Sequence, residues 1–397
     1  MTRLYLDHNA TTPLRAEARA VLLEHLHAGL GNPSSLHTSG RAARAVVDEA
    51  RERVARALGV PEEEVVFTSG ATEANNLALA GVLEACGAGS GLTTCGTEHS
   101  SVLEPARALA ARGYPLTLVA VDREGLPRLE DLAQAVATGG IALVSLAVAN
   151  GETGAAPDLE ALNEVLDGAG ASRPLFHADA VQALGRIPLT LTSSKLDLAS
   201  FSAHKLGGPV GVGVLWRRSG TPLQPRTLGG GQEAEVRPGT ENVASIAAAA
   251  VAIELAVQEQ VEYAERTSQL TRLLWGEIES ALPEVSIVGP PLGSARRIPN
   301  TLCVSVPGTD GRVLVTRLDL EGLEASAGSA CASGSIEPSH VLQAMGYEDE
   351  QARSGLRLSV GRNTIRDDCK RAARIFEKLF GRPSTSRVHT ERCAKRD

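Results

Sequence analysis

Short apolar runs alternate with helical patterns through the first two-thirds of the chain. Helical segments separate most of these runs, and turn residues bound them. The expected strands lie at 65–67, 92–95, 115–121, 141–149, 175–178, 198–202 and 212–216. Strands that are apolar throughout and alternate with helices are typical of a largely parallel sheet covered on both faces. The pattern therefore predicts an α/β fold.

A long helical pattern follows from about Asn242 to Ala281, with no proline inside it. Because it is too long for a simple crossover, we expect it to link two domains. After Pro283 the pattern restarts and predicts a second, smaller α+β unit, with strands at 302–306 and 356–360 and helices near 338–345 and over 365–380. We place a large domain at 14–255, a small domain at 1–13 with 256–380, and a polar tail at 381–397.

Composition narrows the class of protein. A length of 397 residues suits two or three domains. A net charge of −8 and an aromatic content of 3% argue against direct nucleic-acid binding. The N-terminus does not have the pattern of a signal peptide, and no apolar run approaches the length of a membrane span. We therefore expect a cytoplasmic protein without a membrane segment.

The six cysteines indicate reduced thiols rather than a disulfide framework. They are far apart and have no spacing that suits zinc, so no metal site is predicted. They stand at Cys86, Cys95, Cys303, Cys331, Cys369 and Cys393. Most of them are interpreted as small buried hydrophobes. Cys331 is the exception, and the role of Cys393 stays open.

The clearest local signal is the segment 201–213, FSAHKLGGPVGVG. A strand ends there in Ser-Ala-His-Lys and enters a glycine-rich turn. An amine in such an apolar setting has the lowered pKa that a Schiff-base lysine needs, which makes Lys205 a candidate. Ser202 and His204 flank it and could donate hydrogen bonds to a phosphate. An ordinary surface lysine in a loop fits the same residues.

Two further strand ends carry polar groups. Asp179 follows an apolar strand, where ligands bind in open α/β sheets, and its carboxylate could pair with a protonated pyridine nitrogen. A helix N-cap is the alternative interpretation. In the segment 68–76, TSGATEANN, a helix start and the Thr72 hydroxyl could bind an anion, although a simple capped turn is also possible. Together the three junctions predict the parts of a phosphorylated pyridine site.

Three other residues are candidates for chemistry. Cys331 stands in the small-residue segment 325–335, which suits a thiol that must move, or an incidental surface cysteine. His99 follows a strand and could stack on a planar ring and transfer protons, or be structural. Arg357 begins a strand of the second unit. It could hold a carboxylate bidentately in an interdomain cleft, or form an exposed ion pair.

Many separate motifs then give the chain a family resemblance. In order along residues 4–380 they are YLDHNATTPL, GNPSSLHTSGRAAR, FTSGATEANN, TEHSSV, NGETG, HADAVQ, SAHKLGGP, GGGQE, RPGTEN, GSACASGSIEPSHVLQAMG and LRLSVGRNT. The chain resembles cysteine desulfurases of the NifS/IscS type, which are fold-type I, class V aminotransferase-like enzymes that use pyridoxal 5′-phosphate and act as homodimers. The resemblance implies a large domain with a mostly parallel seven-stranded sheet and a smaller α+β domain.

The resemblance also implies roles for individual residues. Lys205 matches the Schiff-base lysine, Asp179 the partner of the pyridine nitrogen, and Gln182 the residue near the ring hydroxyl. His99 matches the histidine stacked on the ring, and Cys331 the cysteine that becomes a persulfide. The other implied cofactor-binding positions are Ala71, Thr72, Asn150, Ser202, His204 and, from the other subunit, Thr240. Asn150 and Arg357 match the residues that hold the carboxylate of the substrate, L-cysteine.

The match has departures and leaves alternatives. Gly151 stands where the family often has a second asparagine, Val210 where it often has a lysine, and the residues before Thr240 differ from its common Arg-Ser-Gly. The segment ending in EPSHVL resembles the long-loop group. A selenocysteine lyase, another class V enzyme and a non-catalytic sulfur-transfer partner are the rival interpretations. The sulfur acceptor stays open between an iron–sulfur scaffold, tRNA thiolation and other routes, as does an iron–sulfur cluster shared through Cys331.

Overall fold

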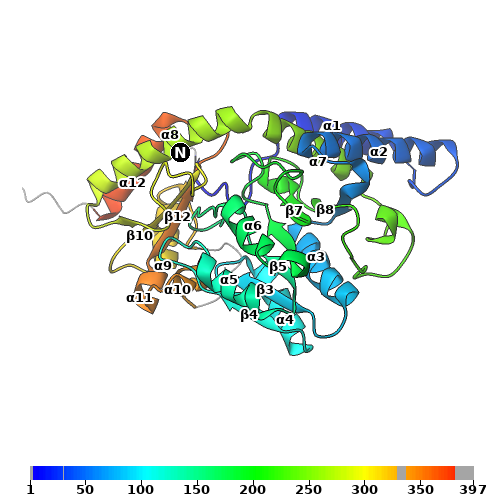
Figure 1. Ribbon diagram of the computed structural model, residues 1–397. Helices are drawn as coiled ribbons and strands as arrows, with labels where there is room; N and C mark the ends of the chain where they lie inside the picture. The colour runs from blue at the N-terminus through cyan, green and yellow to red at the C-terminus, as the bar shows by residue number, and fades with distance from the viewer. Residues whose placement is uncertain (1–2, 30, 329–336, 381–397) are drawn as a thin grey trace, which may run out of the picture.

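The computed structural model describes residues 3–29, 31–328 and 337–380 (Figure 1). Cys331, Cys393 and the tail 381–397 lie outside the described residues. A central sheet with helices on both faces forms the larger part of the molecule, and a smaller sheet with its own helices lies beside it. The long helix α8 (Gln260–Ala281) runs from one part to the other.

The central sheet has seven strands in the order β2-β8-β7-β6-β5-β3-β4. Its strands are β2 (Val65–Thr68), β3 (Gly91–Cys95), β4 (Leu116–Val119), β5 (Ile141–Ser145), β6 (Leu175–Asp179), β7 (Leu198–Ser202) and β8 (Gly213–Arg217). β8 pairs antiparallel with both of its neighbours, and the other pairs are parallel. The predicted α/β class and the mostly parallel seven-stranded sheet are confirmed. The edge strand β4 is not buried on both faces as predicted, because Thr117 and Leu118 are exposed.

Two hydrophobic layers hold the central sheet, one on each face. The helices of the larger part are α1 (Ala16–Ala28), α2 (Thr38–Leu58), α3 (Ala71–Cys86), α4 (Ser100–Ala111), α5 (Leu129–Thr138), α6 (Leu159–Asp167) and α7 (Val243–Gln258). α3 and α4 bury Leu79 and Val102 against one face, where Leu143 lies. α2, α5, α6 and α7 cover the other face, where Val144 and Trp216 lie. This alternation of neighbouring residues follows from the two-residue period of a strand.

The smaller part is built on an antiparallel sheet in the order β12-β10-β9. Its elements are β9 (Ser286–Ile287), β10 (Thr301–Ser305), α9 (Gly311–Leu320), α10 (His340–Ala344), α11 (Asp349–Arg353), β12 (Gly355–Ser359) and α12 (Arg366–Phe380). The N-terminal strand β1 (Leu4–Tyr5) pairs in parallel with β11 (Leu323–Glu324). Leu4 and Leu6 therefore pack in the same hydrophobic cluster as Leu356 and Phe376. The exact domain boundaries remain a prediction.

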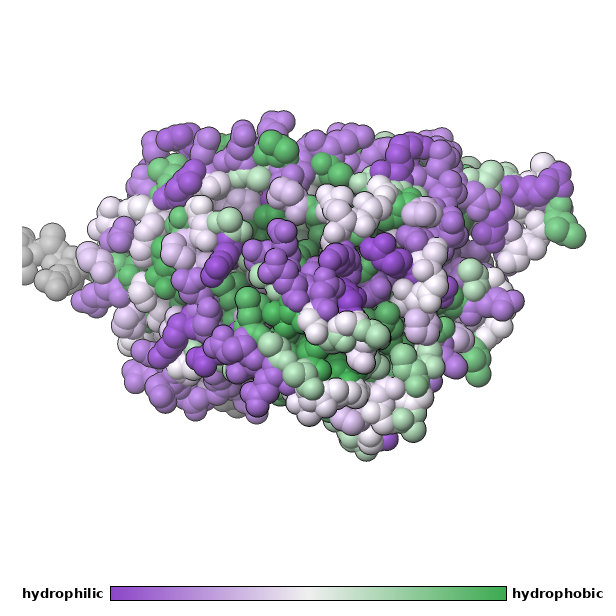
Figure 2. Space-filling model, viewed as in Figure 1, coloured by the Kyte–Doolittle hydropathy of each residue, from purple (hydrophilic) through white to green (hydrophobic). Residues whose placement is uncertain are grey.

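The expectation of one continuous helix from Asn242 to Ala281 is wrong. The chain breaks at Glu259 into α7 and α8, which are bent by 70°. The two halves have different packing partners: α7 lies against α1 and α2, and α8 lies against α12. In the described chain no single helix is long and apolar enough to cross a membrane, although this bent pair meets the criterion by length and composition. The upper edge in Figure 2, where α8 and α1 lie, is largely polar.

The buried imidazole of His177 on β6 should make the fold sensitive to acid. Its ring lies 2.8 Å from Ser145 Oγ and 3.0 Å from Ser200 Oγ, and burial lowers its pKa from 6.5 to about 3. Below pH 6.5 the unfolded chain therefore takes up a proton that the folded chain does not, so stability falls as the pH falls. Between pH 7 and pH 5 this one group should cost about 2 kcal/mol.

Urea unfolding of the wild type and of His177→Gln at both pH values would measure this cost. The variant should lose about 2 kcal/mol less than the wild type over that interval. Equal losses in the two proteins would show that His177 does not cause the acid sensitivity.

Candidate active site

A cavity of about 400 Å³ lies where the carboxyl ends of the parallel strands meet the smaller part of the molecule. It brings together most of the residues that the sequence predicts. These are Ala71, Thr72, His99, Asn150, Asp179, Gln182, Ser202, His204, Lys205 and Arg357. Thr240 is exposed and does not line this cavity of its own chain, and Cys331 lies outside the described residues.

Lys205 stands in the short turn Ala203–Lys205 that follows β7. Its Nζ donates to the carbonyl oxygens of Asn9 and Ala10, each at 2.7 Å. Beside it, burial and then the charge of Lys205 lower the pKa of His204 to about 4. His204 is therefore a neutral imidazole near pH 7, and a second positive charge does not stand next to the amine.

Asp179 is the last residue of β6 and is 7% exposed. Its Oδ2 accepts a hydrogen bond from Asn75 Nδ2 at 2.9 Å, and its Oδ1 accepts one from the backbone N–H of Val181 at 3.0 Å. These two donors orient the carboxylate at the wall of the cavity. Asn75 belongs to α3, which packs on one face of the central sheet.

An anion site is built around the first turn of α3. Gly70 precedes this helix, and Ala71 and Thr72 begin it, so their backbone N–H groups and the positive end of the helix dipole lie at the cavity. Ser202 and His204 line the same cavity. A Cβ at Gly213 would lie 2.4 Å from the carbonyl carbon of Gly70, so glycine is required there for the turn to lie against β8.

Arg357 brings a buried guanidinium to the cavity from β12. It is 3% exposed, its Nη2 donates to Asp7 Oδ1 at 2.7 Å, and its Nη1 donates to the Gly151 carbonyl at 3.1 Å. Its Nε has no hydrogen-bond partner among the described residues. A buried donor of this kind favours an acceptor such as a carboxylate.

Asn150 lines the cavity, but its amide is already used in the turn that follows. Its Oδ1 accepts from the backbone N–H groups of Glu152 and Thr153, each at 2.9 Å. Its Nδ2 donates to the Thr97 carbonyl at 2.8 Å. Asn150 thus shapes the wall of the cavity beside Gly151, and its predicted contact with a substrate carboxylate remains a prediction.

His99 caps the N-terminus of α4. Its Nδ1 accepts from the backbone N–H of Ser101 at 3.1 Å and lies 2.7 Å from the hydroxyl oxygen of the same residue. In this arrangement Nδ1 is an acceptor, so a neutral ring carries its proton on Nε2. The cap fixes the orientation of the imidazole at the cavity wall.

Several residues of this cavity have no predicted role from the sequence: Asn9, Ala10, Glu98, Glu152 and His340. Glu98 is 2% exposed, and its Oε1 accepts from the Ala147 backbone N–H at 2.8 Å. Burial raises the pKa of Glu98 to about 8, and the charge of Asp179 contributes to the rise. Glu98 could have been identified from the sequence, because its carboxyl group directly precedes His99 just after a strand.

The donor set fits a phosphorylated pyridine aldehyde. One cavity contains an amine, a buried carboxylate, a helix N-terminus with hydroxyl groups, and an imidazole. Among residues 3–29, 31–328 and 337–380, no group of three or more His, Cys, Asp or Glu side chains could hold a metal ion.

Comparison with known sequences supports one family. The aminotransferase class-V family matches residues 4–371. Cysteine desulfurase IscS of Dictyoglomus turgidum (strain DSM 6724 / Z-1310) is 40% identical over 378 residues, which cover 95% of this chain and 94% of that protein. Cysteine desulfurase IscS of Clostridium botulinum (strain Hall / ATCC 3502 / NCTC 13319 / Type A) is 38% identical over 379 residues, which cover 95% of this chain and 94% of that protein.

Solved structures lead to the same conclusion. A NifS-like protein has a TM-score of 0.88 and 34% identity to this chain, covering 95% of this chain and 99% of its own. SspA, solved in complex with cysteine, has a TM-score of 0.75 and 29% identity, covering 90% of this chain and 99% of its own. The chain therefore belongs to the aminotransferase class-V family and, within it, to the pyridoxal-phosphate-dependent cysteine desulfurases of the IscS/NifS type.

Proposed function

We propose that this protein is a cysteine desulfurase. It removes sulfur from free L-cysteine, releases L-alanine, and keeps the sulfur as a persulfide on Cys331. The observation that carries the proposal is the common cavity of Lys205 and Asp179, which come from the ends of neighbouring strands. The match to cysteine desulfurases over 95% of the chain supports the same reaction.

Pyridoxal 5′-phosphate is the cofactor that these residues would hold. Lys205 would bind its aldehyde carbon, Asp179 its pyridine nitrogen, and the first turn of α3 with Thr72 and Ser202 its phosphate. When bound, it supplies an electron-withdrawing ring that stabilises negative charge at the α-carbon of an amino acid.

Arg357 would orient the substrate. Its buried guanidinium has an Nε donor that no described residue uses, and Asp7 and Gly151 hold the plane of the group. A substrate carboxylate would accept hydrogen bonds from this group, which places the α-carbon toward Lys205. Two carboxylates would then face Arg357, that of the substrate and that of Asp7.

Protons and sulfur would move between named groups of this chain. The Lys205 amine accepts the α-proton of cysteine, and His99 moves a proton at the substrate sulfur. The Cys331 thiolate attacks that sulfur, so the sulfur–sulfur bond forms as the carbon–sulfur bond breaks, and the carbon gains a proton. L-Cysteine and the enzyme thiol give L-alanine and the enzyme persulfide, with no external oxidant or reductant.

The protein would act as a homodimer and transfer its sulfur to an acceptor protein, such as an iron–sulfur scaffold. Thr240 supports the dimer, because it is exposed and does not line the cavity of its own chain. It would complete the phosphate site of the second copy. Val210 lines the cavity, is 73% exposed and would provide apolar surface for that contact.

Replacing Lys205 by alanine tests the covalent role of the amine. The purified wild type should show a visible absorbance band from the bound cofactor, and Lys205→Ala should lose it because no other group replaces the amine. Absorbance spectra after incubation with pyridoxal 5′-phosphate and dialysis would measure the difference. An unchanged spectrum would refute the role of Lys205.

Replacing Cys331 by serine tests the sulfur-accepting thiol. Cys331→Ser should reduce alanine release from cysteine to background while it keeps the visible band, because serine cannot form a persulfide. Cys86→Ser is the matched control. The interpretation of Cys86 as a buried hydrophobe is wrong, because it is an exposed free cysteine at the end of α3, and it does not line the cavity. Normal turnover in Cys331→Ser, measured as alanine by amino-acid analysis, would contradict the mechanism.

Replacing Arg357 tests substrate binding. Arg357→Gln should raise the KM for L-cysteine about 10- to 100-fold, since a hydrogen bond to a charged group contributes roughly 1.5–3 kcal/mol. Arg357→Lys keeps the charge but loses the planar fork of donors, so its KM should lie between those of the wild type and of Arg357→Gln. Steady-state kinetics would separate KM from kcat, and a loss confined to kcat would contradict the binding role.

A further inference from the structure

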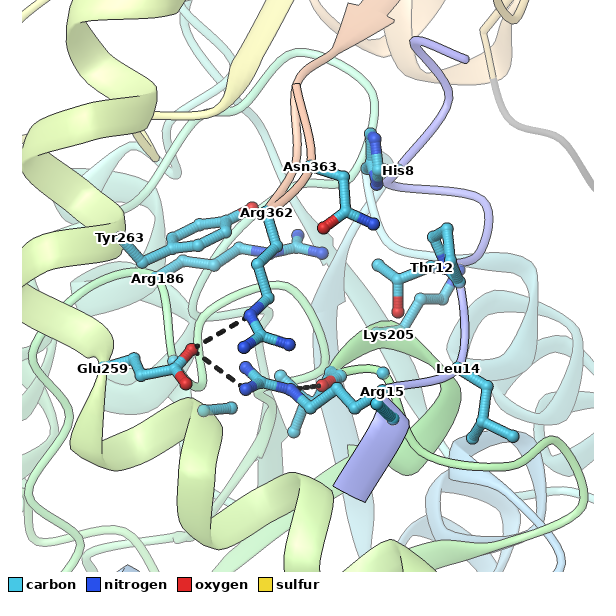
Figure 3. Close-up of a pocket in the computed structure, with 16 residues that line it drawn as sticks. His8, Thr12, Leu14, Arg15, Arg186, Lys205, Glu259, Tyr263, Arg362 and Asn363 are labelled. Carbon is cyan, nitrogen blue, oxygen red and sulfur yellow. Dashed lines mark hydrogen bonds and ion pairs between the residues drawn. The ribbon is translucent and has the colours of Figure 1, made fainter. Parts of the chain in front are cut away.

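A second cavity, of about 280 Å³, shares Lys205 with the active site. Residues at the start of α1, at the break between α7 and α8, and after β12 line it. Figure 3 shows that side chains from these segments converge on one space, although they are far apart in the sequence. Apart from Lys205, none of the residues that line it has a role in the proposed desulfurase chemistry.

Cationic groups dominate the lining. Arg15, Arg186 and Arg362 contribute three guanidinium groups, whereas Glu259 is the one carboxylate among the lining residues that the structure describes. Glu259 Oε2 lies 2.9 Å from Arg15 Nη1 and 3.4 Å from Arg362 Nε (Figure 3). Glu17, which does not line the cavity, is a second carboxylate near Arg362, with Oε2 4.0 Å from its Nη1. Within the lining itself, one carboxylate serves two guanidinium groups, so the lining carries more positive than negative charge.

Arg186 is the group that most needs a partner. It is 2% exposed, its Nη1 donates to Gln182, and the Tyr263 hydroxyl is a further polar neighbour of the guanidinium. Its Nη2 has no hydrogen-bond partner among the described residues. In Figure 3 its guanidinium extends toward the space between Arg362 and Thr12. A buried charged donor without an acceptor is costly, so this position favours a bound acceptor.

Arg15 is also buried, and it shares its carboxylate partner Glu259 with Arg362. It is 7% exposed, and burial lowers its pKa, an effect to which the positive charge of Arg362 contributes. Arg362 itself is 43% exposed at the mouth of the cavity. The cavity thus has buried cations inside and a solvent-accessible cation at its entrance, an arrangement that admits an anion from solution.

We propose that this cavity binds a small molecule through a phosphate or carboxylate oxyanion. The planar forks of guanidinium groups match the oxygens of both anions. A volume of about 280 Å³ exceeds what a single ion needs, which favours a small metabolite that carries the anionic group. This site is separate from the cofactor phosphate site at α3.

The position of the site couples it to the lysine turn. Arg15 Nε donates to the Leu206 carbonyl at 2.9 Å, and the backbone N–H of Thr12 donates to the His204 carbonyl at 3.1 Å. An anion held by Arg15 therefore contacts the residue that fastens the turn carrying Lys205. Binding would stabilise that turn in the position that the active site requires.

Titration with inorganic phosphate tests the proposal. The cofactor-loaded protein is used, so that the phosphate site at α3 is already filled, and calorimetry measures the binding. The wild type should bind phosphate saturably, and Arg362→Gln should weaken binding at least about 10-fold, as loss of a charged hydrogen bond predicts. Arg19→Gln is the matched control, because Arg19 is an exposed arginine of α1 that does not line the cavity.

The outcomes decide between occupants. Saturable binding of phosphate, or of acetate in a parallel titration, that is weakened in Arg362→Gln and not in Arg19→Gln supports the site. Absence of saturable binding, or equal binding in both variants, overturns it. If neither anion binds and Arg362→Gln instead weakens the dimer in sedimentation velocity, an acidic side chain of a second copy occupies the cavity, and the proposal is also wrong.

Discussion

The parallel pairing of β6 with β7 is the constraint on which the active site depends. Asp179 lies opposite Ser200 in this register, and β7 continues directly into the turn that carries Lys205. Both strands end at the same edge of the sheet, so the carboxylate and the amine face one cavity. With β7 reversed, a strand of five residues would separate the two groups by roughly 16 Å, at about 3.3 Å per residue. No side-chain adjustment could close that distance.

Asn9 connects this edge to the smaller part of the molecule. Its carbonyl accepts from Lys205 Nζ, and its Nδ2 donates to Thr301 Oγ1 of β10 at 2.7 Å. Its backbone N–H donates to Ser359 Oγ of β12 at 2.9 Å, close to Arg357 on the same strand. A single buried asparagine thereby connects the lysine of one part with the strand that carries the cavity-lining Arg357 of the other. The N-terminal segment is thus part of the active site as well as a strand of the smaller part.

Local sequence patterns predict which side chains lie at strand ends, because the two-residue period and the flanking turns depend on neighbouring residues. Asp179, Lys205 and His99 could therefore be placed at one edge before the structure was known. The break at Glu259 could not, because it follows from packing of α7 and α8 against different helices rather than from a proline or glycine. Glu98 also escaped prediction, since its burial depends on the loop that brings Ala147 to it. The proposed contribution of Thr240 concerns a second copy of the chain, so a single chain does not test it.

The charges around Lys205 form a pattern that joins the two cavities. Burial lowers the pKa of His204 and that of His8 to about 4, so these two imidazoles, one near each cavity, are neutral near pH 7. The fixed positive charges lie instead on arginines, Arg357 in one cavity and Arg15, Arg186 and Arg362 in the other. An amine that must exchange protons benefits from neutral neighbours, whereas anion binding benefits from cations that never lose theirs. In the proposed functions, the neutral His204 therefore stands next to the lysine, whereas Arg357 and the arginines of the second cavity supply the charge for anion binding.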